Sequence, residues 1–123
     1  MLRYTAPMVA LLVVVSPACA QRPGCHDPQT TIEMRRCLAQ DLRQAEDSLR
    51  VVEDTLAKAL DDSAGVRLRQ ARQMWEQYRK QQCDAVAAVF LPGTMGPVME
   101  LQCLIEATEQ RRKLLLDMYS SQL

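Results

Sequence analysis

The sequence predicts an all-α fold, a disulfide-stapled bundle of three helices in which the first helix is long. Apolar residues recur at steps of three and four along three separate stretches, which is the period of an amphipathic helix. No stretch shows the alternating pattern of a strand bounded by turns. Four cysteines follow the first 20 residues, and an even number in a short exported chain is typical of disulfides.

The first helix is expected from Thr30 to Asp62. The Thr30 hydroxyl can accept a hydrogen bond from an unpaired backbone amide, and Glu33 stands where a capping box requires it. A heptad seam of about three repeats follows, as in a long helix that lies along its partners at a shallow angle. The seam consists of Leu38, Leu42, Ala45, Leu49, Val52, Leu56 and Ala59. A break is expected at residues 61–65, which include two aspartates and a glycine.

The second helix, expected from Val66 to Phe90, contains the only tryptophan of the chain. Its apolar stripe is Leu68, Ala71, Trp75 and Tyr78, and it ends on Cys83. Such a stripe indicates core packing, so Trp75 and Tyr78 are predicted core residues together with Leu49 of the first helix. The charged residues of this stretch are expected to point elsewhere: Arg69, Arg72, Glu76, Arg79 and Lys80.

The third helix is expected from Pro97 to Ser120, because a proline suits the first turn of a helix. Its predicted inner face consists of Val98, Leu101, Ile105, Thr108, Leu115 and Tyr119, with Arg112 as the one residue that does not fit. Between the second and third helices, Leu91-Pro92-Gly93 predicts a sharp stop.

Residues 1–20 have the features of a secretory signal peptide. Arg3 provides the positive start, an apolar run of eight residues follows, and Ala18-Cys19-Ala20 is an A-x-A cleavage signature. The run is too short to span a bilayer, so we expect cleavage before Gln21 and a periplasmic or secreted protein. A lipid anchor at Cys19 is the less favoured alternative, because Ser16 and Pro17 occupy the approach to that cysteine.

The remaining chain is long enough for one domain, with a flexible leader at 21–29 and a helical domain at 30–123. Without Arg3, 14 Lys and Arg residues stand against 15 Asp and Glu residues. This balance gives no electrostatic basis for binding nucleic acid. The heptad seam is equally suited to pairing with a second copy, so the oligomeric state stays open.

The four cysteines allow three pairings. If the second and third helices turn around residues 91–96, Cys83 and Cys103 face each other, which leaves Cys25 to pair with Cys37. A Cys37–Cys83 link is the alternative. A zinc site is disfavoured because there is no C-x-x-C motif and His26 is the single histidine.

No arrangement of residues predicts catalysis. Neighbouring carboxylates occur three times, but adjacent residues of a helix point in different directions and cannot share a reacting atom. These pairs are Glu46/Asp47, Glu53/Asp54 and Asp61/Asp62. With the thiols oxidised, no activated nucleophile is available. We therefore expect no catalytic, cofactor-binding or metal-binding residue.

Spaced motifs follow one another along almost the whole chain after residue 24. They are Cys25-x11-Cys37, Ala45-Glu46-x-x-Leu49, Trp75-x2-Tyr78-Arg79-x3-Cys83, Gly93-Thr94-Met95-x-Pro97, Cys103 and Thr108-x-x-Arg111. With these motifs the chain resembles the lysozyme inhibitor LprI-like family of small exported helical proteins of the bacterial envelope. The resemblance implies a non-enzymatic protein that binds another protein, and lysozyme is the partner that the family name indicates. The chain departs from the family at Arg72 and Lys80, where glutamine and an acidic residue are frequent.

If the protein binds a partner, the loop from Leu91 to Pro97 is the candidate binding segment. Lysozymes are cationic with an acidic cleft, so an inhibitor either inserts a shaped loop or offers complementary charge. The candidate partner-binding residues are Gly93, Thr94 and Met95 in this loop and Arg79 before it. A plain helix-terminating turn is the structural alternative for the loop. A non-catalytic structural or protein-interaction module of the periplasm is the alternative function.

Overall fold

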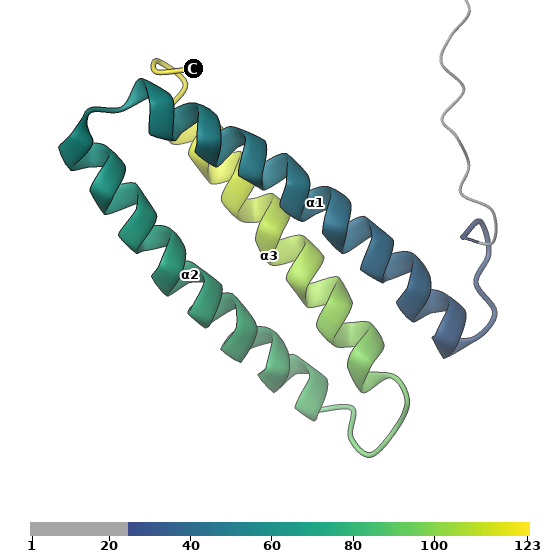
Figure 1. The fold of residues 1–123 in the computed structure, drawn as a ribbon. Coiled ribbons are helices and arrows are strands. Elements are labelled where there is room, and N and C mark those ends of the chain that lie inside the picture. Colours follow the sequence, from purple (N-terminus) through teal and green to yellow (C-terminus); the bar gives the residue numbers. More distant parts are fainter. Residues whose placement is uncertain (1–24) are drawn as a thin grey trace, which may run out of the picture.

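The computed structural model describes residues 25–123, and these form three helices with no strand among them. Helix α1 spans Thr31–Ala59, α2 spans Asp62–Ala88 and α3 spans Gly96–Met118. Figure 1 shows α1 and α3 running in one direction and α2 in the opposite one. Helix α3 packs against both others, whereas α1 and α2 contact each other little. The predicted all-α bundle is confirmed; the signal-peptide prediction falls on residues outside the described range.

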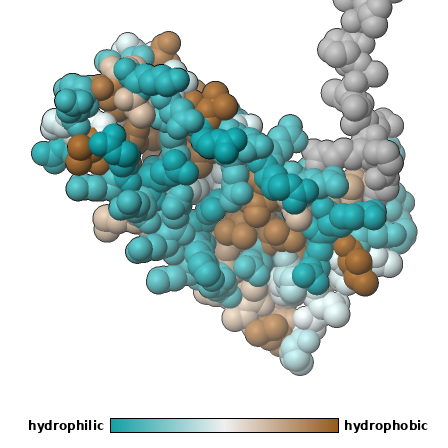
Figure 2. Space-filling view, in the orientation of Figure 1, coloured by the Kyte–Doolittle hydropathy of each residue, from teal (hydrophilic) through white to brown (hydrophobic). Residues whose placement is uncertain are grey.

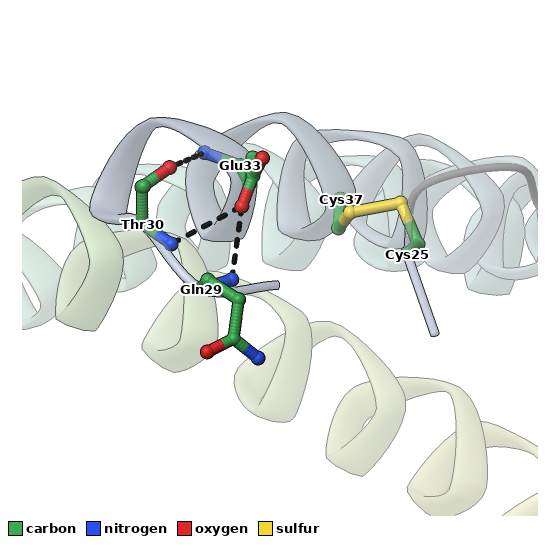
Figure 3. Close-up of a disulfide and its surroundings, with 5 residues drawn as sticks. All are labelled: Cys25, Gln29, Thr30, Glu33 and Cys37. Carbon is green, nitrogen blue, oxygen red and sulfur yellow. Dashed lines mark hydrogen bonds between the residues drawn. A yellow bond between two sulfur atoms is a disulfide. The ribbon is translucent and has the colours of Figure 1, made fainter. Parts of the chain in front are cut away.

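The start of α1 carries the expected capping box (Figure 3). The Glu33 amide donates to the Thr30 hydroxyl at 3.2 Å, and the Glu33 carboxylate accepts from the amides of Gln29 at 2.9 Å and Thr30 at 3.2 Å. These bonds satisfy amides that have no partner inside the helix. A disulfide between Cys25 and Cys37 then fastens the preceding segment to α1.

The hydrogen bonds from the Gln29 and Thr30 amides hold the pKa of Glu33 below its ordinary value of 4.5. A carboxyl whose pKa is lowered on folding stabilises the protein above its unfolded-state pKa and ceases to do so as the pH falls through the folded-state value. Glu33→Gln should therefore melt below the wild type at about pH 7, and the gap should close in acid. Thermal melts across the acid range test this. Glu106→Gln, at an exposed position on α3, is the control, and a gap for Glu33→Gln that is equal at every pH would contradict the expectation.

The connection between α1 and α2 is shorter than expected. Helix α1 ends at Ala59, and α2 already begins at Asp62, four residues before the predicted start. The reason is Asp61, whose carboxylate accepts a hydrogen bond from the Ala64 amide at 2.7 Å and so caps α2. Gly65 consequently lies inside α2, where it is buried, and does not form part of a break.

The hydrophobic core consists of four buried leucines, Leu49, Leu56, Leu68 and Leu115. Partly buried apolar residues pack against it: Val52, Leu60, Trp75 and Tyr119. Leu49 is thus buried in the core, whereas Trp75 packs against the core and is only partly buried. The prediction for Tyr78 is wrong, because this side chain is 62% exposed on the outer surface of α2.

The inward face of α2 is rotated by about one residue from the predicted stripe. Its more buried positions are Leu68, Arg72, Trp75, Arg79 and Cys83, while Ala71 and Tyr78 are exposed. Two arginines therefore occupy places where two apolar residues were expected. A similar shift occurs on α3, where the arginine that turns inward is Arg111 and not Arg112.

Candidate protein-binding site

The connection between α2 and α3 forms an exposed apolar tip, which we define as residues 89–95. Val89 is 78% exposed and Leu91 is 67% exposed, and Phe90 and Met95 also reach the surface. No charged residue occurs between Ala85 and Met99. Figure 2 shows this end of the molecule in brown and pale colours, whereas teal covers most of α2. Apolar surface gathered at one place of a small protein is typical of an interaction site.

The ends of α2 and α3 that adjoin the tip hold it in a fixed conformation. Cys83, which is fully buried near the end of α2, forms a disulfide with Cys103 of α3. Gly96 is buried at the start of α3, where an added Cβ would lie 3.1 Å from the Ala87 carbonyl oxygen, so a larger residue would push the two helices apart. Within the tip, the amides of Phe90 and Gly93 each donate to a carbonyl three residues earlier. These contacts reduce the freedom that the tip would lose on binding.

Three of the four candidate binding residues lie together in this tip. Gly93, Thr94 and Met95 are all exposed. At Gly93 a Cβ would approach the Phe90 carbonyl oxygen to 3.1 Å, so the turn has little space for a side chain there. The tip thus offers a partner the Met95 thioether and the Thr94 hydroxyl beside the aliphatic side chains.

The fourth candidate, Arg79, lies elsewhere and is engaged inside the bundle. Its guanidinium donates to the Thr108 hydroxyl at 2.7 Å and to the Glu46 carboxylate at 3.0 Å. Its carbon Cζ lies 4.8 Å from the centroid of the Trp75 ring, a cation–π distance. The side chain is only 17% exposed. Arg79 therefore joins the three helices and does not extend the tip.

A second ionic group lies beside Arg79 and centres on Glu53, which is buried in α1 with 6% exposure. Its carboxylate accepts from Arg111 Nε at 3.0 Å and lies 3.3 Å from Arg72 Nε. Arg111 also approaches the Trp75 ring, with Cζ 4.8 Å from the centroid. The hydrogen bond from Arg72 to Glu76 raises the pKa of Arg72, so this cation stays charged.

The described part of the chain holds no cluster of three His, Cys, Asp or Glu side chains that could bind a metal ion. Among the same residues, no helix has the length and apolar character needed to cross a membrane. What the exposed surface offers chemically is apolar contact area at the tip and scattered charges on the helices.

Comparison with known protein families gives a match to the family model described as lysozyme inhibitor LprI, over residues 25–115. The chain belongs to the lysozyme inhibitor LprI family. The match includes all three helices, both disulfides and the tip, and it ends three residues before the end of α3. An uncharacterized protein of Rhizobium meliloti (strain 1021) is 27% identical to the chain. The alignment is 136 positions long and covers 98% of each of the two chains. No solved structure matches the chain.

The motifs that identify this LprI family member meet in the ionic group at the centre of the bundle. Arg79 contacts Glu46, Thr108 and the Trp75 ring. Arg111 contacts the same ring. These motif residues thus join the helices, and only the motif around Gly93 lies on the exposed tip.

The sequence pattern did not predict that Glu53 is buried or that Arg72, which is partly exposed, turns toward it. A signal was present, because Glu46 and Glu53 are seven residues apart and so are Arg72 and Arg79. A spacing of seven places two residues on the same face of a helix. Matched charges at this spacing on two helices indicate an ion-paired seam.

Proposed function

We propose that this LprI family member is an exported, non-enzymatic protein of the bacterial envelope that binds lysozyme-type muramidases and inhibits them by non-covalent docking. The observation that carries the proposal is the exposed, uncharged tip, braced by the Cys83–Cys103 disulfide. Family membership supports a protein partner of this class. The two disulfides and the signal-like first 20 residues support export into an oxidising compartment.

The tip is suited to docking for two physical reasons. Its apolar side chains already stand in water, so contact with a partner would remove apolar area from solvent. Its backbone is held by the disulfide and by the close packing of Gly96 on α2, so little conformational entropy would be lost on binding. A braced loop of this kind can occupy a concave substrate cleft and exclude the substrate.

Substitution of Thr94 and Met95 by glutamate should abolish inhibition and leave the thermal melt unchanged. Both side chains are exposed, so the fold does not depend on them, whereas two carboxylates would be repelled by the acidic cleft of a muramidase. The measurement is the rate of cell-wall lysis by a c-type and a g-type lysozyme at increasing concentrations of the oxidised protein.

The matched control is Ser63→Glu with Met74→Glu. It likewise replaces one hydroxyl residue and one methionine by glutamate, at exposed positions of α2 outside the tip, and it should inhibit as the wild type does. Equal inhibition by both double variants would exclude the tip from the interface. Full lysozyme activity at tens of micromolar wild-type protein would remove the inhibitor proposal for those enzymes, in favour of a structural or protein-interaction module.

A further inference from the structure

A groove lies beside the tip, between the first turns of α1 and α3. We call it the end groove; it has a volume of about 430 Å³. Its lining residues are Ile32, Arg35, Arg36, Ala39, Pro97, Glu100 and Leu101. Pro97 directly follows Gly96, so the groove continues from the tip along α3. Figure 1 shows the start of α1 and the α2–α3 connection at the same end of the bundle.

The end groove combines apolar surface with exposed positive charge. Ala39, Pro97 and Leu101 supply apolar lining, and Ile32 is 77% exposed at its edge. Arg35 and Arg36 are exposed, and within residues 25–123 neither guanidinium takes part in a hydrogen bond or a close ion pair. The nearest charge effect is that of Arg36 on Glu33, one turn earlier, where it helps to lower the pKa of that carboxyl.

The arginines at the centre of the bundle behave differently. Arg72, Arg79 and Arg111 each have a carboxylate within 3.3 Å. Their charge is neutralised inside the fold, whereas the donors of Arg35 and Arg36 remain free for an external acceptor. A guanidinium forms paired, charge-assisted hydrogen bonds with a carboxylate more readily than any other cationic side chain does.

We infer that the end groove is the charged half of the muramidase-binding surface, and that Arg35 and Arg36 bind carboxylates at the substrate cleft of the muramidase. This inference rests on the proposed function. Enzymes that hydrolyse glycosidic bonds carry a pair of carboxyl groups about the scissile bond, so their clefts are acidic. The tip has no charge between Ala85 and Met99, and the groove that adjoins it is lined by these two arginines.

The division of roles follows from the physics of association. The apolar tip supplies contact area, and the arginines supply attraction toward the acidic cleft and the orientation of the bound protein. Glu100, on the opposite wall of the groove, repels an entering carboxylate. The arginines therefore bind carboxylates at the rim of the groove. Binding should consequently weaken as salt is added, because exposed charges are screened.

The test is charge reversal in the oxidised protein, with Arg35→Glu and Arg36→Glu combined. The variant should fold, because both side chains are exposed. Its melt should fall only slightly, because replacing Arg36 removes a cation that helps to lower the pKa of Glu33 one turn earlier. Its Kd for lysozyme should rise roughly 100-fold, and the salt dependence of binding should largely disappear. Calorimetry or surface-based binding at low and high salt gives both quantities.

The matched control is Arg67→Glu with Arg69→Glu, which changes the net charge equally at the opposite end of the bundle, in exposed positions of α2. Its Kd should stay within about threefold of the wild type, since distant exposed charges are screened. If both double variants bind lysozyme as the wild type does, the end groove is not in the interface and the inference is wrong, while the proposed function stands.

Two further results would overturn the inference. A wild-type protein that binds no lysozyme overturns the proposed function, and the inference with it. Undiminished lysozyme binding by the Arg35/Arg36 double variant, together with loss of its binding to phosphatidylglycerol vesicles, would assign the two arginines to lipid headgroups and not to a muramidase.

Discussion

Reduction of both disulfides is expected to lower the free energy of unfolding by about 6 kcal/mol, roughly 3 kcal/mol for each cross-link on the chain-entropy model. The two bonds close segments with sequence separations of 12 and 20 residues. A domain of this size is stable by only about 5 to 15 kcal/mol, so the reduced protein should melt at least roughly 20 °C lower. Thermal and urea melts with and without a phosphine reductant measure the effect.

The two disulfides should contribute unequally to the native bundle. Cys83 is fully buried and its bond joins α2 to α3, whereas the Cys25–Cys37 bond fastens only the segment before α1. The Cys83→Ala/Cys103→Ala variant should therefore lose more stability than Cys25→Ala/Cys37→Ala. Coincident melts of the oxidised and reduced protein would contradict a stabilising role for either bond.

Replacement of Glu53 by alanine is expected to cost about 3 to 5 kcal/mol, the usual loss when one partner of a buried ion pair is removed. The variant would leave the Arg111 guanidinium, which is 9% exposed, without its carboxylate partner. Arg72 would lose less, because it is nearer the solvent and keeps Glu76. Urea-induced unfolding, followed by the fluorescence of the single tryptophan, gives the free-energy difference.

Glu76→Ala is the matched control for Glu53→Ala. Both substitutions remove a carboxylate that pairs with Arg72, but Glu76 is exposed, so its loss should cost less than about 1 kcal/mol. Replacing Glu53 and Arg111 together by methionine should restore most of the stability, because no buried charge is then left unpaired. Equal losses for the two alanine variants would show that the Glu53 pair does not stabilise the bundle.

Features that depend on neighbouring residues were predictable. The capping box at Thr30 and Glu33 formed as expected, because its atoms lie within one turn of helix. The proline and glycines after Leu91 ended α2 near the predicted place. The two disulfides join cysteines that are close in sequence or symmetric about a turn, and the pairing that helix geometry favoured is confirmed. The predicted start of α2 was too late, because the N-cap at Asp61 starts the helix before Gly65 and the glycine does not interrupt it.

The sequence by itself determined three helices, their order and two cross-links, since periodicity, caps and turns act over a few residues. Only the tertiary structure decided which face of α2 turns inward. Hydrophobic periodicity assigns each side chain by its own preference for water, and it placed Tyr78 inside and Arg79 outside. The fold reverses this, because Glu46 and Glu53 of α1 and Thr108 of α3 meet the arginines of α2 across the bundle. An arginine becomes an interior residue when a carboxylate stands opposite, and that pairing joins residues up to 58 positions apart in the chain.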